Sequence, residues 1–282
     1  MSGAMGRSTN ATIPVALSVL TWKAPDTLAR TLPSLAPIAT LFSERIVVCQ
    51  ESDPREIGIA REHGFTPIML RENVGIQRGL AKCVEAPASD IVLVLENDCP
   101  FLGSGNDTGR ILDAISLVRG GKAHVVQMSL QEAPRGRYTR YWRLTDPPRR
   151  NLRGLLLRSD ADAVSSDAVF ATPPAIPLGV EAISPGLYLT SSAKRPWANR
   201  PFLTTKEFFL GELIAFAEAN PTSRSVNGKP DLEHAISSRH NRWWWRERGF
   251  SVGFMHPGLF GHQREDRPST DEKGRQLATE PA

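Results

Sequence analysis

Short apolar runs alternate with segments of helical spacing over the first hundred residues. Each run is expected to be a strand buried on both faces, because nearly every position in it is apolar. A helix with Pro33 near its end and a helix capped by Ser52 and ending at Gly64 separate the first three runs. The predicted strands are Pro14 to Thr21, Arg45 to Gln50, Phe65 to Leu70 and Asp90 to Glu96. A short helix over Gln77 to Ala86 completes a β-α-β-α-β-α-β order, which predicts an α/β fold with a parallel sheet.

The later part of the chain shows the same patterns in two blocks. Residues 107–121 are predicted to be helical and 123–130 to form a strand, whereas 161–185 have little period and are predicted to be a loop. The second block is expected to contain a strand at 187–190, a compact turn from Trp197 to Phe202, helices over 204–219 and from Pro230 to about Arg248, and a strand at 250–255. We therefore divide the chain into a flexible N-terminus (1–12), a first α/β half (13–131), an insertion (132–185), a second half (186–262) and a polar tail (263–282).

Composition is ordinary for a globular protein of 282 residues, with 40% apolar and 23% charged residues. No apolar stretch is long enough to span a bilayer, and no secretory signal is recognisable at the N-terminus. Cys49, Cys83 and Cys99 lie far apart, which excludes a Cys-based zinc motif and a disulfide framework. We expect a cytoplasmic protein in which Cys49 and Cys83 fill the core.

The net charge of +4 has a local origin. Residues 135–158 contain eight arginines and one aspartate, interleaved with Tyr138, Tyr141 and Trp142. Such a segment could grip phosphates and stack on bases, could be a solvated insertion, or could contact an anionic membrane face peripherally. Because the basic residues are confined to one segment, a nucleic-acid partner is disfavoured.

Polar residues mark the ends of the predicted parallel strands, where α/β sheets bind their ligands. The fourth strand runs into Glu96, Asn97 and Asp98, and Thr21-Trp22, Glu51 and Asn73 follow the other three. Carboxylates at such an edge suit Mg²⁺ or Mn²⁺, and the alternative is a polar turn. The chain lacks the Gly-x-Gly-x-x-Gly and Gly-x-x-x-x-Gly-Lys signatures, which disfavours dinucleotide and P-loop phosphate binding.

Three motifs resemble those of GT-A fold glycosyltransferases of the family 2 kind. They are Thr-Trp followed by Ala-Pro-x-Thr-Leu after the first strand, the loop Asn73-Val74-Gly75-Ile76-Gln77-Arg78-Gly79, and Glu96-Asn97-Asp98 in place of Asp-x-Asp. The resemblance implies a GT-A fold with a Rossmann-like, mostly parallel central sheet flanked by helices. It also implies that residues 13–131 bind a nucleotide-sugar donor.

Site residues follow from the same resemblance. The base and ribose are expected near Thr21, Trp22, Glu51 and Asn73, with Gly75 and Arg78 in the adjoining loop. Asp98 is expected to ligate Mn²⁺ or Mg²⁺ at the diphosphate, and Glu96 to lie beside the ribose or a metal-bound water. Asn97 is expected among the substrate-binding residues. His262 is the expected third ligand, with His256 as the alternative.

The acceptor is expected to lie against residues 186–262. The resemblance implies a carboxylate base, for which Glu233 is the first choice and Asp231 the second; both residues could instead only stabilise a helix N-terminus. Trp197 is expected either to stack on a sugar ring or to anchor the core.

Together these expectations describe a metal-dependent, inverting glycosyltransferase. It would move a sugar from a nucleoside diphosphate, UDP by analogy, to a hydroxyl group of a glycan, glycolipid or protein. The alternatives are a nucleotidyltransferase that makes a nucleotide-sugar and a non-catalytic polyanion or nucleic-acid binder that uses residues 135–158. The first strand is not followed by the Gly-rich basic loop that a nucleotidyltransferase usually shows.

Overall fold

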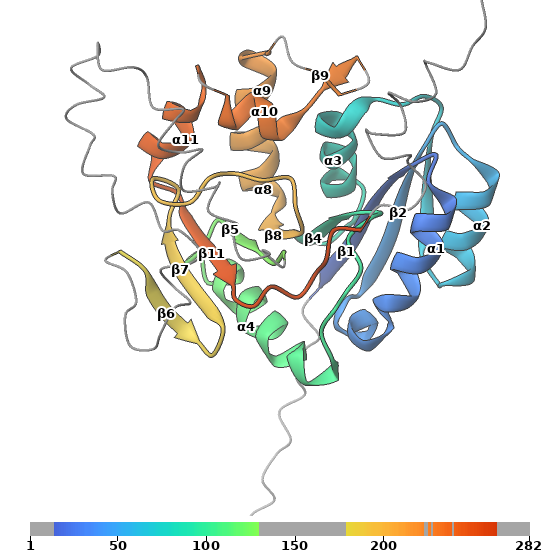
Figure 1. The fold of residues 1–282 in the computed structure, drawn as a ribbon, viewed down its shortest axis with the longest axis horizontal. Helices are drawn as coiled ribbons and strands as arrows, with labels where there is room; N and C mark the ends of the chain where they lie inside the picture. Colours follow the sequence, from blue (N-terminus) through green and yellow to red (C-terminus); the bar gives the residue numbers. More distant parts are fainter. Residues whose placement is uncertain (1–13, 130–178, 223–224, 227, 239, 264–282) are drawn as a thin grey trace, which may run out of the picture.

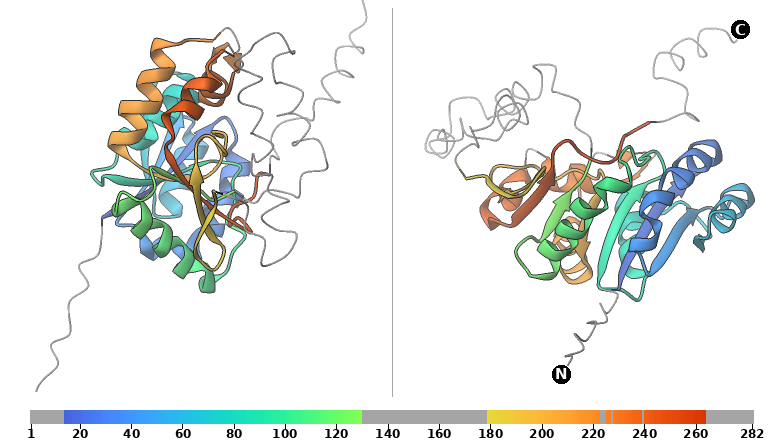
Figure 2. Two further views of the ribbon diagram at one scale, coloured as in Figure 1. Left: turned by 90° about the vertical axis from the view of Figure 1, so that its left-hand side faces the viewer. Right: turned by 90° about the horizontal axis from the view of Figure 1, so that it is seen from below.

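A single nine-stranded sheet organises the part of the chain that the computed structural model describes, residues 14–129, 179–222, 225–226, 228–238 and 240–263. Helices cover both sides of this sheet (Figure 1; Figure 2). The sheet order is β3-β2-β1-β4-β8-β5-β11-β7-β6. Its strands are β1 (Val15–Trp22), β2 (Glu44–Gln50), β3 (Thr66–Leu70), β4 (Ile91–Glu96), β5 (Val125–Gln127), β6 (Glu181–Ser184), β7 (Leu187–Ser191), β8 (Phe202–Thr205) and β11 (Ser251–Met255).

A separate two-stranded hairpin consists of β9 (Ser225–Val226) and β10 (Lys229–Pro230). The helical segments are α1 (Pro25–Ser34), η1 (Ala36–Leu41), α2 (Pro54–Glu62), α3 (Gly75–Glu85), η2 (Gly105–Asp107), α4 (Thr108–Arg119), α8 (Lys206–Phe208), the π-helical η4 (Phe209–Ile214), α9 (Ala215–Ala219), α10 (Leu232–Ser237) and α11 (Arg242–Arg248). No helix of the described residues is both long and apolar enough to cross a bilayer.

The alternation of side chains along the central strands creates two hydrophobic cores, one on each face of the sheet. Leu17 of β1 and Leu93 of β4 point to the core beneath α1, α2 and α4, and their neighbours Ala16 and Val92 point to the core beneath α3 and α8–α11. Strands buried on both faces are therefore apolar at successive positions, as the sequence pattern indicated. The expected α/β fold with a helix-flanked central sheet is confirmed.

Strand direction places the polar strand ends at one edge of the sheet. The four strands at one side of the sheet, β3, β2, β1 and β4, are all parallel. β8 is antiparallel to both of its neighbours, β4 and β5, so β5 runs in the same direction as β4. β11 pairs with β5 in parallel and therefore also runs in this direction. The carboxyl ends of β1, β4, β5 and β11 therefore lie along one edge. That edge carries the site described below.

Several sequence-based boundaries were wrong. The helix predicted from Pro230 to Arg248 is two helices, because Ser238 is extended and its hydroxyl accepts a hydrogen bond from the Asn241 amide. Residues 202–205 form strand β8 instead of belonging to a turn and a helix, and β6 lies in the predicted loop. Asp53, not Ser52, caps α2, since its carboxylate accepts from the Arg55 amide. The basic segment 135–158 lies outside the described residues.

The three cysteines are free and buried. Burial raises the pKa of the Cys49 thiol to about 12 and also raises the pKa of the Cys83 thiol. These thiols stay protonated at neutral pH and pack against apolar neighbours in the two cores. The prediction that Cys49 and Cys83 fill the core is confirmed.

Candidate active site

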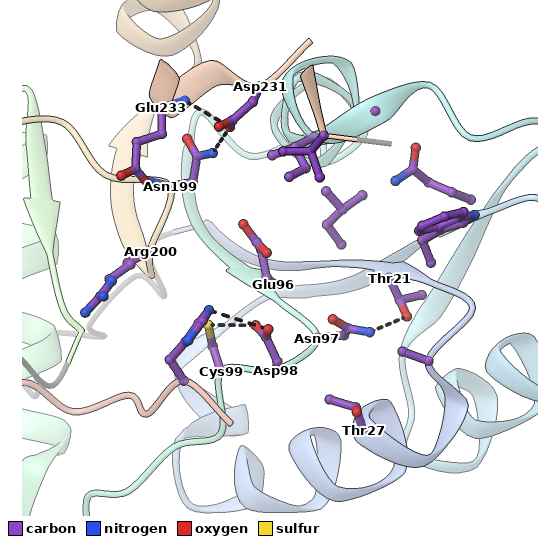
Figure 3. Close-up of a pocket in the computed structure, with 18 of the residues that line it drawn as sticks. Thr21, Thr27, Glu96, Asn97, Asp98, Cys99, Asn199, Arg200, Asp231 and Glu233 are labelled. Atoms are coloured by element: carbon purple, nitrogen blue, oxygen red, sulfur yellow. Dashed lines mark hydrogen bonds and ion pairs between the residues drawn. The ribbon is translucent and has the colours of Figure 1, made fainter. Parts of the chain in front are cut away.

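A cleft of about 320 Å³ opens at the carboxyl ends of β1 and β4 (Figure 3). This volume falls in the range of small-molecule sites. Most of the predicted site residues line it: Thr21, Trp22, Asn73, Gly75, Glu96, Asn97, Asp98, Asp231, Glu233 and His262. The polar lining residues that the sequence analysis did not select are Thr27, Gln50, Cys99, Asn199 and Arg200.

Asp98 and His262 meet in the cleft although they are far apart in the sequence. The His262 Nε2 atom lies 3.5 Å from the Asp98 Oδ2 atom, and Asp98 is 3% exposed. Backbone hydrogen bonds explain this approach: the Gln263 amide donates to the Asp98 carbonyl at 2.7 Å and the Gly261 amide to the Pro100 carbonyl at 2.8 Å. The segment after β11 thus runs antiparallel to the segment after β4 and carries His262 to the carboxylate.

The charge of the cleft is strongly unbalanced. Four carboxylates line it, those of Glu96, Asp98, Asp231 and Glu233, and Arg200 is the lining residue with a permanent positive charge. In Figure 3 the Glu96 side chain lies between Asp98 on one side and Asn199 on the other. An anionic ligand would be repelled here unless a cation entered with it.

The donor set fits a divalent metal ion that is completed by a ligand. Asp98 supplies a carboxylate and His262 an imidazole at adjacent positions. Among the described residues, no group of three or more His, Cys, Asp and Glu side chains is arranged to hold a metal. Mg²⁺ and Mn²⁺ sites commonly use few protein ligands and take their remaining oxygens from phosphates and water.

The loop before α3 closes one end of the cleft. Gln50 is 3% exposed, and its Oε1 atom accepts a hydrogen bond from the Val74 amide at 2.8 Å. The Asn73 Oδ1 atom accepts from the Gly75 amide at 2.8 Å. Gly75 has φ +85°, and a Cβ atom there would lie 2.5 Å from the Cβ atom of Lys229. A glycine is therefore required where this loop passes under the β9–β10 hairpin.

A buried carboxylate, that of Glu56, is hydrogen-bonded to the end of β1 and through it to the end of β4. The Oε1 atom of Glu56, which is fully buried, accepts from the Thr21 hydroxyl at 2.5 Å and from the Ala24 amide at 2.9 Å. Thr21 in turn accepts from the Asn97 Nδ2 atom at 3.0 Å. Burial raises the pKa of Glu56 above its ordinary value. This chain of contacts fixes two cleft-lining side chains against each other.

Asn199 organises the opposite wall. Its Nδ2 atom donates to the Asp231 Oδ1 atom at 2.7 Å. Its backbone amide donates to the Glu233 Oε2 atom at 3.4 Å. Asp231 also caps α10 by accepting from the Glu233 amide at 3.2 Å (Figure 3). The Asp231 Oδ1 atom thus has two donors, whereas Glu233 extends from the first turn of the helix into the cleft lining.

Four predicted residues lie elsewhere. Trp197 is 1% exposed and packs against Phe202, Phe209 and Trp245, so the stacking role is wrong and the core-anchor role is confirmed. Its indole nitrogen donates to the Asn199 Oδ1 atom, which makes it a support of the cleft wall.

Glu51, Arg78 and His256 do not belong to the cleft lining. Glu51 forms an ion pair of 2.5 Å with Lys23, and the hydrogen bond with that lysine lowers the pKa of Glu51. Arg78 is exposed on α3. At the end of β2 the inward position is occupied by Gln50, the residue before Glu51. The sequence therefore predicted that the end of this strand carries polar residues, but it did not predict which of them faces the cleft.

Comparison with known proteins supports the fold. No family model matches the chain, and no curated protein matches it. The crystal structure of S. aureus TarS superposes with a TM-score of 0.50 at 10% sequence identity, covering 89% of this chain and 37% of TarS. The chain has the GT-A fold.

Two further solved structures align at lower TM-scores. The glucosyl-3-phosphoglycerate synthase from Mycobacterium tuberculosis, in complex with Mn²⁺, UDP and glucosyl-3-phosphoglycerate, has a TM-score of 0.49 and 15% identity over 95% of this chain and 78% of its own. CMP:2-keto-3-deoxy-manno-octonic acid synthetase complexed with CTP has a TM-score of 0.46 and 10% identity over 94% of this chain and 98% of its own.

Proposed function

We propose that this protein is a metal-dependent glycosyltransferase that moves a sugar from a nucleoside diphosphate, UDP in the first instance, to an acceptor hydroxyl group. The supporting observation is the composition of the cleft. Four carboxylates, one guanidinium and one imidazole line it at the carboxyl edge of the parallel strands. A diphosphate can occupy such a cleft together with a divalent cation, and Asp98 with His262 is the pair that can hold it.

Asp98 and His262 are the proposed metal ligands. Their 3.5 Å separation brings one hard oxygen donor and one nitrogen donor to the same point. When bound, Mg²⁺ or Mn²⁺ neutralises the charge that develops on the leaving diphosphate. Arg200, on the same cleft, supplies a further positive group toward the phosphate oxygens.

The nucleoside would lie against the ends of β1 and β2. Trp22 offers an apolar face, and Gln50 and Asn73 offer amide groups. The Gln50 oxygen already accepts a hydrogen bond from the Val74 amide. Thr21 and Asn97 are held by Glu56 and by each other. This end of the cleft is therefore preorganised, which lowers the entropy cost of binding.

Glu233 is the proposed base. In an inverting transfer the acceptor oxygen attacks the anomeric carbon on the face opposite the phosphate. The new carbon–oxygen bond forms as the sugar–phosphate bond breaks, and Glu233 takes the hydroxyl proton. Asp231 is the less suitable carboxylate, because its Oδ1 atom accepts hydrogen bonds from Asn199 and from the helix that it caps. A glycan, a glycolipid or a protein could supply the hydroxyl group.

Thermal unfolding with UDP or GDP, each with and without Mn²⁺, tests the donor site. Binding at a hundredfold excess over Kd stabilises a protein by about 2.7 kcal/mol, which is readily measured as a rise in Tm. We expect UDP with Mn²⁺ to raise Tm and either component alone to do so much less. If neither UDP nor GDP raises Tm in the presence of Mn²⁺, the proposal is refuted.

The base is tested separately by Glu233→Gln, with Glu247→Gln as the matched control because Glu247 is exposed on α11. Glu233→Gln should keep UDP binding within a few-fold and reduce sugar transfer by roughly 10² to 10⁴-fold, the usual contribution of a general base. Equal turnover in the two variants would remove Glu233 from this role.

A further inference from the structure

Arg195 carries a buried guanidinium. It is 6% exposed, and among the described residues no carboxylate forms an ion pair with it. Burial lowers the pKa of its guanidinium to about 9. Burying an ion without a partner is unfavourable even after the protein relaxes, and a buried group with a strongly shifted pKa is a candidate for a functional site.

The guanidinium is held in a fixed orientation. Its Nε atom donates to the Gln127 Oε1 atom at 2.5 Å, and its plane lies over the Phe254 ring with 4.2 Å between the guanidinium carbon and the ring centroid. Gln127 is itself held by the Pro196 carbonyl, to which its Nε2 atom donates at 2.9 Å. A guanidinium has five N–H donors, and this arrangement uses one of them. Among the described residues, no acceptor takes a hydrogen bond from the two terminal nitrogens.

The surroundings of Arg195 are electropositive. His256 follows β11, and its pKa is lowered by burial and by the positive charges of Arg110 and Arg195. Arg110 is tied in place, since its Nη2 atom donates to the Gly186 and Pro257 carbonyls. An anion placed beside Arg195 would be attracted chiefly by Arg195 itself, because the charge of Arg110 is partly balanced by its ion pair with Asp107 at 3.2 Å.

Arg195 lies at the same edge of the sheet as the cleft. Its partners Gln127 and Phe254 belong to the carboxyl-terminal ends of β5 and β11, which run parallel to β4. β5 is two strands from β4 in the sheet, about 10 Å away at the usual strand spacing. Arg200 precedes β8, the strand between them, and lines the cleft. Arg195 is not itself among the lining residues, so a ligand would extend beyond the cleft along this edge to reach it.

We propose that Arg195 forms a subsite that binds an anionic group, a phosphate or a carboxylate, of the acceptor. The inference rests on the proposed function, because it assigns a chemical class to the acceptor of that reaction. A bidentate contact between the two terminal nitrogens and two anionic oxygens would both orient the acceptor and supply a counter-ion that the described residues do not provide. The acceptor would then carry its reactive hydroxyl group toward Glu233 and its charge toward β5 and β11.

The test measures the rise in Tm of the full-length protein on titration with inorganic phosphate, without metal, against sodium chloride of matched ionic strength. Arg195→Gln removes the cation, and Gln127→Glu keeps it but places a carboxylate against its Nε atom. Arg119→Gln, an exposed position on α4, is the matched control. We expect both test variants to weaken the apparent phosphate affinity roughly ten- to hundredfold, and Arg119→Gln to leave it unchanged. Gln127→Glu keeps the measurement meaningful if Arg195→Gln does not fold.

The outcomes separate this subsite from other sites and from the proposed function. The absence of a wild-type response to both phosphate and acetate, or a response that is retained in both test variants, would overturn the proposal; loss of such a retained response in His262→Ala would assign it to the metal site instead. A parallel titration with acetate distinguishes a carboxylate ligand from a phosphate ligand, and a response that depends on Arg195 in either titration supports the subsite. Binding of UDP with Mn²⁺ is measured separately, so its failure would reject the donor site without changing what the phosphate titration reports.

Discussion

Gly75→Ala should displace the loop at the closed end of the cleft, although it adds only one methyl group. Gly75 has φ +85°, and a Cβ atom there would lie 2.5 Å from the Lys229 Cβ atom, whereas ordinary contacts begin at 3.4 Å. The loop or the β9–β10 hairpin must therefore move by about 0.9 Å, the difference between these two distances. An L-residue in this backbone region costs about 1–2 kcal/mol in addition.

The size of the effect can be separated into its two causes. We expect Gly75→Ala to lower the free energy of unfolding by about 2–5 kcal/mol, the sum of the backbone cost and a typical overpacking cost. Lys229→Gly removes the obstructing Cβ atom, so in the double variant the overpacking part should be recovered and the backbone part should remain. Urea unfolding of the four proteins of this double-mutant cycle gives the coupling energy directly.

Gly58→Ala is the matched control. Gly58 lies inside α2 and a Cβ atom there would meet nothing within 4 Å, so alanine should be neutral or stabilise by about 0.5–1 kcal/mol. Calorimetry with UDP and Mn²⁺ should show weaker binding for Gly75→Ala and unchanged binding for Gly58→Ala. If Gly75→Ala matched the control in both stability and affinity, the close packing of this loop against the hairpin would be refuted.

Three further predictions concern single side chains. Asp98→Asn should abolish the Mn²⁺-dependent part of UDP binding while leaving the unfolding midpoint of the apoprotein within a few degrees; metal-dependent binding that persisted in calorimetry would exclude Asp98 as a ligand. Trp197→Ala should cost about 3–5 kcal/mol in urea unfolding, because a buried aromatic side chain and its hydrogen bond to Asn199 are lost together. Glu56→Gln should change the pH dependence of stability: burial raises the folded-state pKa of Glu56 above its ordinary value of 4.5, so the favourable contribution of this carboxyl is complete below pH 4.5 and is lost as the pH rises through the folded-state pKa. The stability of the wild type relative to Glu56→Gln should therefore fall with rising pH above 4.5, and a difference that stayed constant across unfolding curves at several pH values would contradict this assignment.

Local sequence pattern was sufficient to predict the first half of the protein. Strands β1 and β4 are buried on both faces, so nearly every residue between Val15 and Thr21 or between Ile91 and Leu95 is apolar, and the pattern identifies them without any tertiary information. Their parallel arrangement follows from the helices between them, and this places their polar ends together. The nearness of Thr21 to Asn97 was therefore already contained in the sequence.

Short elements and side-chain directions were not predictable in this way. β8 has four residues and gains its identity from pairing with β4 on one side and β5 on the other. Gln50 rather than Glu51 lines the cleft because β2 ends at Gln50, and Glu51, with φ +62°, lies in the following turn and pairs with Lys23. Asn199 and Arg200 come from a segment whose sequence showed only a turn.

The sequence by itself determined the α/β class, the two-sided burial of the central strands and the row of polar strand ends, because these depend on residues that are close in the chain. Tertiary structure decided which of those polar groups share one cleft. Asp98 and His262 come together through backbone pairing between the segments after β4 and β11, and Arg195 is held in place because β5 and β11 supply Gln127 and Phe254 against it. Contacts of this kind join residues that are distant in sequence, and no local pattern of apolar and polar positions encodes them.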